Sequence, residues 1–170
     1  KGPDSDLSTE SILDESAATL NTLPLETRVP AFNDVATTER LAIGLPKDII
    51  LSFLLVDDDI DILKAMGRAI TKQGHRLITC ANGDDALTIA QHESFDVIIS
   101  DVDMPGLRGD KLLLELKKLK NPSTIVLYSG NTSDLGSEVR NVCDGIFSKP
   151  MIPDNLIAQC LEIYRRKQSS

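Results

Sequence analysis

The stretch that decides the fold class is Ile50-Leu51-Ser52-Phe53-Leu54-Leu55-Val56-Asp57-Asp58-Asp59, an apolar run that ends at three aspartates. The apolar part is short and rich in branched side chains. Such a run is typical of a strand that is buried on both faces, as in a parallel sheet. We therefore expect a buried strand near residues 50–56, with three carboxylates at its carboxyl end.

Runs of the same kind recur along the chain and alternate with helical patterns. Further strands are expected near residues 76–80, 95–100, 124–128 and 144–148, and amphipathic helices at 60–73, 83–92, 109–119 and 153–167. Gly74 is expected to end the first of these helices. The stretch 131–141 predicts only a poor helix, because Gly136 interrupts it and its apolar anchors are Leu135 and Val139. Five alternations of strand and helix predict an α/β fold, a doubly wound five-stranded parallel sheet with right-handed crossovers.

Residues 1–48 differ in composition from the rest of the chain. They hold ten Ser or Thr, and nine acidic residues against four basic ones. This composition is typical of a linker, although Ile12, Leu20 and Leu23 fall on one helical face. Both alternatives stay open, an N-terminal extension that acts as a linker and a partly helical arm packed on the domain. We expect the globular domain at residues 49–168, excised from a longer protein because the sequence starts without Met.

Charge and cysteine spacing argue against several function classes. A net charge of −8 disfavours binding to nucleic acid or to an anionic membrane surface, because both need Lys and Arg to neutralise phosphates. Cys80, Cys143 and Cys160 lie far apart and are too few for a disulfide framework, so we expect a reducing, cytoplasmic location. The sequence has no apolar stretch near the roughly 20 residues that a membrane span requires.

Reactive side chains stand directly after the expected strands. Asp57, Asp58 and Asp59 follow the first strand, Asp101 the third, Ser129 the fourth and Lys149 the fifth. Because ligands of open α/β sheets gather at the carboxyl ends of the strands, we expect these side chains at one edge. Each alone has an ordinary structural alternative, and Asp59 could be only the N-cap of the following helix. The functional interpretation therefore depends on the whole set and its order.

The chemistry of such a cluster follows from its charge. Carboxylates held together repel one another unless one takes up a proton or the group binds a cation. A few hard oxygen ligands suit Mg²⁺, which would screen and polarise an incoming phosphoryl group. Asp101 could then attack as the nucleophile and form an aspartyl phosphate. Ser129 Oγ and Lys149 Nζ would hold the other phosphoryl oxygens.

This set resembles the response-regulator receiver family of two-component signalling. The matching segments are Leu54-Leu55-Val56-Asp57-Asp58-Asp59, Ile98-Ile99-Ser100-Asp101-Val102-Asp103-Met104-Pro105-Gly106, Val126-Leu127-Tyr128-Ser129-Gly130 and Ile146-Phe147-Ser148-Lys149-Pro150. The resemblance runs from about Ile49 to Arg166 and implies a flavodoxin-like sheet of order 2-1-3-4-5. It also implies a signalling protein rather than a metabolic enzyme. A sensor histidine kinase or a histidine phosphotransfer protein would supply the phosphoryl group, an unidentified output partner would read it, and a dimer is an option.

The resemblance assigns a role to each residue of the set. Asp57 and Asp58 correspond to the acidic pair that holds Mg²⁺, with Asp58 the more direct ligand. Asp101 corresponds to the phosphorylated residue, which also faces the metal. Ser129 and Lys149 correspond to the hydroxyl and the ammonium that bind the phosphoryl group. The bond between Lys149 and the proline after it is cis in the family.

Three further positions bear on the resemblance. Asp103 corresponds to the residue whose backbone carbonyl is a metal ligand, and its acidic side chain stands beside the site. Together with Asn131, which is expected to flank the phosphoryl group, it would tune dephosphorylation. Ile146 stands where the family often has an aromatic residue that moves on activation. The neighbouring Phe147 should point to the other face of its strand, which puts the usual aromatic switch in doubt.

Three other functions share parts of this pattern. A haloacid-dehalogenase-type phosphatase also uses Asp-x-Asp after a strand, but its acid pair follows that motif, whereas here Asp57 and Asp58 precede it. A receiver-like interaction module that does not use phosphate is a second alternative, disfavoured because every reactive position is intact. A flavodoxin is excluded, since three aspartates after the first strand would repel the flavin phosphate.

Overall fold

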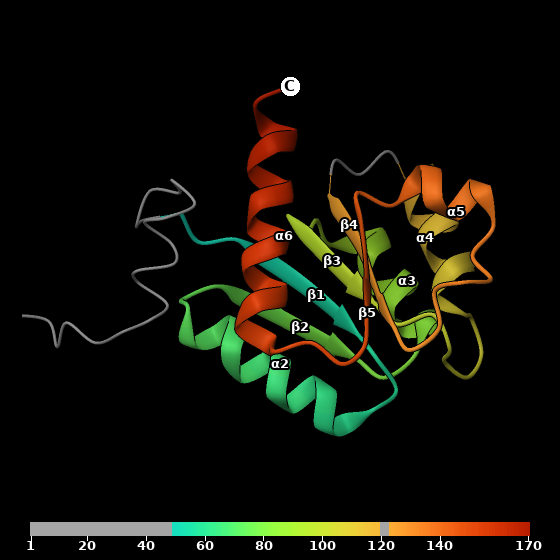
Figure 1. The fold of residues 1–170 in the computed structure, drawn as a ribbon, viewed down its shortest axis with the longest axis horizontal. Coiled ribbons are helices and arrows are strands. Elements are labelled where there is room, and N and C mark those ends of the chain that lie inside the picture. Colours follow the sequence, from blue (N-terminus) through green and yellow to red (C-terminus); the bar gives the residue numbers. More distant parts are fainter. Residues whose placement is uncertain (1–48, 120–122) are drawn as a thin grey trace, which may run out of the picture. The chain divides into compact units, whose positions relative to one another are not determined.

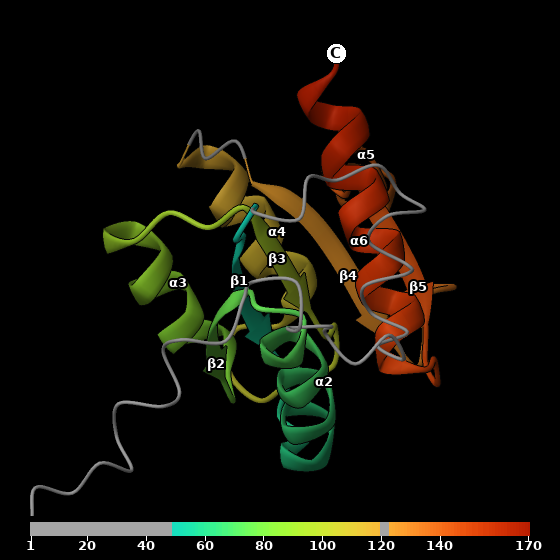
Figure 2. The ribbon, with the colours of Figure 1, turned by 90° about the vertical axis from the view of Figure 1, so that its left-hand side faces the viewer.

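The sheet in the computed structural model is parallel throughout and carries helices on both faces (Figures 1 and 2). The structure describes residues 49–119 and 123–170. The strands are β1 (Ser52–Val56), β2 (Arg76–Cys80), β3 (Val97–Ser100), β4 (Thr124–Ser129) and β5 (Gly145–Ser148). They pair in the order β2-β1-β3-β4-β5, which confirms the predicted fold class and the predicted strand order.

The apolar runs became strands because this sheet buries them from both sides. β1, β3 and β4 are buried along their whole length, whereas the edge strands β2 and β5 are only partly buried. Three strands start later than predicted, β1 and β3 by two residues and β5 by one. β1 pairs with β2 from Ser52 onward, and β3 pairs with β1 only from Val97. Just before that point, the Asp96 carboxylate accepts hydrogen bonds from the backbone N–H and the hydroxyl of Ser52.

The helices divide the core into two apolar clusters. The helices are α2 (Ile60–Lys72), α3 (Gly83–His92), α4 (Gly109–Lys118), α5 (Ser137–Val142) and α6 (Pro153–Gln168). One cluster joins the sheet to α2 and α6, and the other joins it to α3, α4 and α5 (Figure 2). Apart from α5, the bounds differ from the predicted ones by one residue at most. Both faces are therefore covered, and the carboxyl edge of the sheet is left for a site.

The helix ends follow local rules. Asp59 is the N-cap of α2, and its carboxylate accepts two backbone N–H groups of the first turn, which confirms its structural alternative. Gly74, with φ 83°, follows α2 in the left-handed conformation that commonly ends a helix. The prediction of a poor helix at 131–141 is also confirmed, because only Ser137–Val142 becomes helical, with Val139 buried.

The predictions for residues 1–48, a linker or a helical arm, lie outside the described residues. Within residues 49–119 and 123–170, no helix is both long enough and apolar enough to cross a membrane.

Two leucines near the end of α4 allow a test of how strongly the core holds the fold. Leu116 is fully buried, whereas Leu119 is 39% exposed. We expect Leu116→Ala to lower the free energy of unfolding by about 2–5 kcal/mol through lost burial and a cavity. Leu119→Ala is the matched control and should cost less than about 1 kcal/mol. Urea denaturation of both variants measures the difference, and equal costs would contradict the described packing.

Candidate functional site

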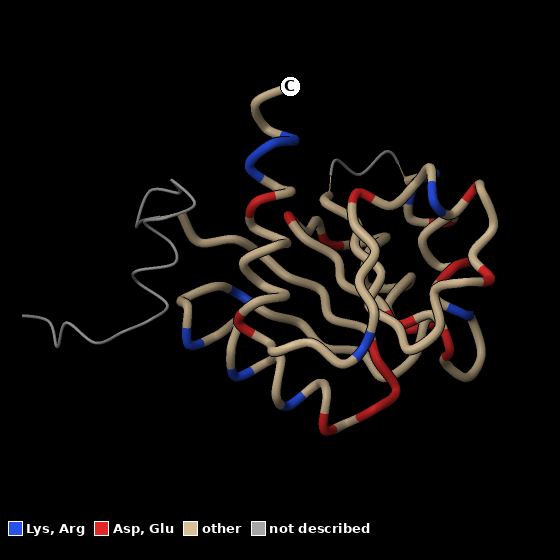
Figure 3. Tube along the Cα trace, viewed as in Figure 1, with Lys and Arg blue, Asp and Glu red and all other residues tan. Residues whose placement is uncertain are grey.

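The site is built from the carboxyl ends of four neighbouring strands. Asp57 and Asp101 follow Val56 and Ser100, which are register partners in β1 and β3. The Asp101 N–H donates to the Val56 carbonyl at 2.8 Å, so the ladder extends to the first reactive residue. Parallel pairing thus brings two aspartates that are far apart in sequence to adjacent positions, as predicted. Figure 3 shows the run of acidic positions that follows β1 at this edge.

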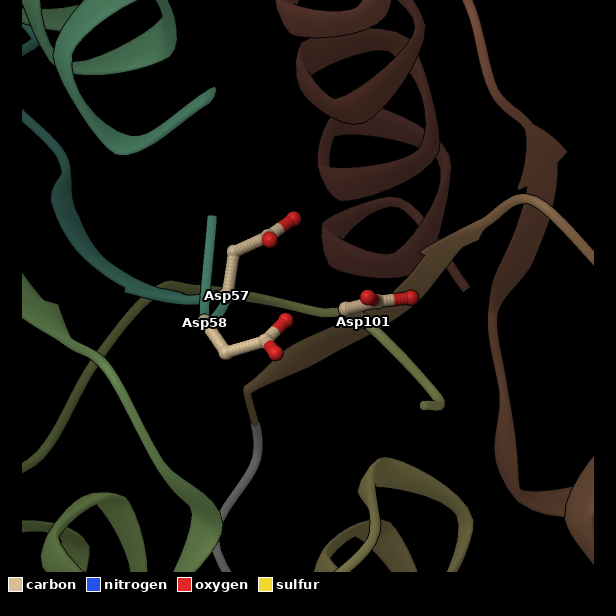
Figure 4. Close-up of side chains that lie close together, drawn as sticks. All are labelled: Asp57, Asp58 and Asp101. Atoms are coloured by element: carbon tan, nitrogen blue, oxygen red, sulfur yellow. The ribbon is translucent and has the colours of Figure 1, made fainter. Parts of the chain in front are cut away.

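Three aspartates form the acid cluster, which we define as Asp57, Asp58 and Asp101. One carboxylate oxygen from each lies within 4.8 Å of the others, and Figure 4 shows the three side chains close together. Asp57 and Asp101 are buried, with 1% and 7% exposure, while Asp58 is exposed. The cluster therefore has two carboxylates fixed inside the protein and a third that faces solvent.

Lys149 enters the acid cluster from β5. Its Nζ lies 2.7 Å from Asp57 Oδ2 and 3.1 Å from Asp101 Oδ2. Burial raises the pKa of Asp57, and this effect exceeds the lowering by hydrogen bonds from Lys149 and from the Asp59 N–H. Burial by itself would lower the pKa of Lys149, but its hydrogen bonds and attraction to Asp57 and Asp101 raise it overall. The two buried aspartates thus favour the ammonium form of Lys149, and the site sets three carboxyl groups against one ammonium.

Ser129 ends β4 and is fully buried. Its neighbour across the ladder is Ser148, and the Lys149 N–H donates to the Ser129 carbonyl at 2.9 Å. The Ser129 hydroxyl accepts a long hydrogen bond, 3.4 Å, from the Asn131 N–H. The ends of β4 and β5 thus bring the backbones of Ser129 and Lys149 together at the same edge of the sheet. The peptide bond between Lys149 and Pro150 is cis, as the family resemblance implied.

Asp103 stands apart from the acid cluster. Its side chain is exposed and lies 3.3 Å from Arg108 Nη1. The described residues include no grouping of its carboxylate with the other three. The metal contact predicted for Asp103 would come from its backbone carbonyl and not from its carboxylate. It stays a prediction. Arg108 was not identified from the sequence, because its pairing depends on how the loop after β3 folds back.

The backbone of Asp101 is enclosed by its surroundings. The Val102 N–H donates to Asp101 Oδ1 at 2.7 Å, and the Ser100 hydroxyl donates to the Asp101 carbonyl at 2.8 Å. Gly109, the first residue of α4, lies so close that a Cβ there would overlap that same carbonyl. Sequence analysis did not single out Gly109. The only signal was a glycine at a helix start, which is too common to be specific.

Ile146 and Phe147 point to opposite faces of β5, as predicted. Ile146 packs against the apolar cluster under α3, α4 and α5, whereas Phe147 packs against the cluster under α2 and α6. Tyr128, which was also not singled out, belongs to the same cluster as Phe147 and lies with its ring under Lys149. The sequence held one signal for it, since a buried tyrosine hydroxyl usually needs a hydrogen-bond partner.

A parallel sheet of this order, with carboxylates and a lysine at its carboxyl edge, defines the receiver class. The response regulator receiver domain family matches residues 53–160, and the chain belongs to that family. The probable transcriptional regulator ycf29 of Pyropia yezoensis is 38% identical over 109 residues, which cover 62% of this chain and 49% of that protein. The chain spans about half or less of the length of the first curated relatives that it matches.

Solved structures agree in fold. The chemotaxis response regulator CheY4 of Vibrio cholerae is 28% identical with a TM-score of 0.60, and the match covers 68% of this chain and 99% of that one. The DrrB receiver domain, solved in a BeF3-activated form, is 25% identical with a TM-score of 0.60, and the match covers 72% of this chain and 100% of that one.

Two glycines test the contact between α4 and Asp101. Gly109→Ala should lower the free energy of unfolding by about 1–3 kcal/mol, because the new Cβ must displace the Asp101 carbonyl or the start of α4. Gly136→Ala is the control, since a Cβ there meets no atom within 4 Å, and it should change stability by less than about 0.5 kcal/mol. Thermal or urea unfolding reports both values. A neutral Gly109→Ala would show that this approach is not needed.

Proposed function

We propose that this domain takes a phosphoryl group from a phosphohistidine onto Asp101, with Mg²⁺ at the acid cluster, and that phosphorylation changes which partner it binds. The observation that carries the proposal is the position of Lys149, whose Nζ contacts both buried aspartates at 2.7 and 3.1 Å. An ammonium held beside a buried carboxylate nucleophile is suited to bind the oxygens of an arriving phosphoryl group.

The residues of the acid cluster fit Mg²⁺. They offer hard carboxylate oxygens within 4.8 Å of one another, and the exposed Asp58 leaves space for the water ligands that Mg²⁺ retains. Asp57, Asp58 and Asp101 would hold the ion, together with the backbone carbonyl of Asp103. When bound, Mg²⁺ would screen the charge of the phosphoryl group and polarise it.

Asp101 would be the nucleophile in the transfer. One of its carboxylate oxygens attacks phosphorus, the P–N bond to the donor imidazole breaks, and the electron pair stays with the imidazole nitrogen. The hydrogen bond from the Val102 N–H to Oδ1 fixes the carboxylate plane for that attack. The Lys149 ammonium and the Ser129 hydroxyl would bind the phosphoryl oxygens. Asp103 and Asn131 would flank the product and set how readily water hydrolyses it.

The two remaining alternatives are weaker on specific grounds. A haloacid-dehalogenase-type phosphatase would need the acid pair after the Asp-x-Asp motif, whereas Asp57 and Asp58 precede Asp101, and the family match is to receivers. An interaction module that does not use phosphate has no need for Lys149 to reach Asp57 and Asp101 together, at the cost of burying three charged groups.

The proposed donor is a sensor histidine kinase or a histidine phosphotransfer protein. The receiver is proposed to span residues 49–168, with 1–48 as an extension, and to act in the cytoplasm, where its thiols stay reduced. None of the cysteines in the described residues is in a disulfide. Because the whole chain carries a net charge of −8, the receiver is proposed to signal by protein contact and not by its own binding to nucleic acid or membrane.

The phosphoacceptor assignment is tested by intact mass after incubation with acetyl phosphate and Mg²⁺. We expect the wild type to gain about 80 daltons, the mass of one phosphoryl group. Asp101→Asn should gain nothing, because the amide is not a nucleophile. Asp61→Asn, a control at an exposed aspartate on α2, should still be modified, since its side chain lies outside the acid cluster. Chelation of Mg²⁺ should abolish the adduct. An adduct on Asp101→Asn, or none on the wild type, contradicts the proposal.

Lys149→Met separates the two roles of the site. Removal of the ammonium should tighten Mg²⁺ binding by about tenfold or more, because two cations about 4 Å apart repel by about 1 to 4 kcal/mol as the effective dielectric constant falls from about 80 to about 20, and about 1.4 kcal/mol is a factor of ten in affinity. The phosphorylation rate should fall by about 100-fold or more, because the phosphoryl oxygens lose a charged donor. Lys111→Met, an exposed position on α4, is the control and should change neither quantity. Calorimetric Mg²⁺ titration gives the Mg²⁺ affinity and the time course of the mass assay gives the phosphorylation rate. A fall of the Mg²⁺ affinity together with the rate would count against the assignment.

A further inference from the structure

We infer that Tyr128 is a positioning residue that couples the charge state of the acid cluster to the segment Lys149–Ile152, which leads into α6. The inference rests on the proposed function and adds a route by which the phosphoryl group is sensed. That route is needed because Ile146 occupies the position at which an aromatic side chain was expected.

Tyr128 lies in β4 directly before Ser129 and is 5% exposed. Its register partner in β5 is Phe147, and both belong to the apolar cluster under α2 and α6. A phenol in this position is buried among apolar side chains, where its hydroxyl needs a polar partner. That partner lies outside the strands.

The hydroxyl of Tyr128 holds the entry to α6. It accepts a hydrogen bond from the Met151 N–H at 2.9 Å, and its own proton points to the Met151 carbonyl at 3.4 Å. The next residue, Ile152, is the N-cap of α6 and makes no side-chain cap hydrogen bond. The tyrosine hydroxyl therefore fixes a backbone segment that lacks the capping side chain found at α2.

The ring of Tyr128 contacts Lys149, the residue that pairs with the acid cluster. Lys149 Nζ is 5.5 Å from the ring centroid, within the range of a cation–π contact. The same Nζ bridges Asp57 and Asp101. One ammonium is thus shared between the acid cluster and the ring, while the ring's hydroxyl is bound to Met151.

A phosphoryl group on Asp101 would change the electrostatic attraction that acts on the Lys149 ammonium. The new oxygens carry more negative charge than the carboxylate they replace, so they draw Lys149 Nζ toward themselves. Any displacement alters its contact with the ring, and the ring can adjust only together with the Met151 hydrogen bond. The signal reaches Ile152, which is 64% exposed and available to a partner. Such a chain of packed and hydrogen-bonded groups is a physical path for coupling.

The test follows the amide NMR spectrum of the ¹⁵N-labelled protein while Mg²⁺ and beryllofluoride, a phosphoryl mimic, are added. Tyr128→Phe keeps the ring and removes the hydroxyl. We expect its beryllofluoride affinity and its amide shifts at Asp101 and Val102 to stay within about twofold of wild type, while the shifts at Met151 and Ile152 fall by at least half. Tyr164→Phe, which changes the chain's other tyrosine, should behave as wild type.

Tyr128→Leu removes the ring as well. Its beryllofluoride affinity should fall by about threefold to thirtyfold, because Lys149 loses the surface that positions it. Dispersion of the amide spectrum shows whether this variant folds; if it does not, Tyr128→Phe alone decides.

The outcomes separate the inference from the proposed function. If the wild type shows no beryllofluoride response at Asp101, the proposed function fails and the inference fails with it. If that response is present but Met151 and Ile152 respond equally in wild type and Tyr128→Phe, the inference is overturned and the proposed function stands. Loss of the Met151 and Ile152 response with an intact response at Asp101 supports it.

Discussion

Like charges held at one edge of a parallel sheet are the constraint on which this structure depends. All strands of a parallel sheet end on the same side, so the residues that follow the neighbouring strands β1 and β3 lie next to each other. Because Val56 and Ser100 are register partners, Asp57 and Asp101 meet in a place that is nearly closed to water. Burial already works against the charge on Asp57. The lysine that follows β5 offsets part of that cost, and the three carboxyl groups against one ammonium are the basis for the cation site proposed at this edge.

The rest of the fold keeps this unfavourable arrangement in place. Three strands buried on both faces hold the register, and the apolar clusters on the two faces prevent it from slipping. Local contacts also hold the charged residues in place. Asp59 caps α2 immediately after the acid pair, and Gly109 lets α4 start against the backbone of Asp101. The energy that confines the charges therefore comes from apolar burial elsewhere, as is common for functional sites.

Much of this could be predicted from the sequence because it depends on local patterns. Apolar runs marked the strands, and their ends marked the site residues. The period of two along β5 correctly separated Ile146 from Phe147. What could not be predicted depends on side-chain directions between distant segments. The bridge from Lys149 to two aspartates, the pairing of Asp103 with Arg108, and the hydrogen bond from Met151 to Tyr128 are of this kind. The starts of β1 and β3 differ from the prediction, because they are set by pairing with neighbouring strands and not by the apolar runs themselves.

The ion pair between Lys149 and Asp57 joins residues 92 positions apart in the chain. During synthesis the three aspartates of the acid cluster and most of the sheet emerge well before the last strand. A nascent domain that lacks β5 carries the buried aspartates without the ammonium that pairs with them. Under the proposed function, efficient phosphorylation would therefore require that the last strand has docked, and the ability to receive a signal would depend on completed folding.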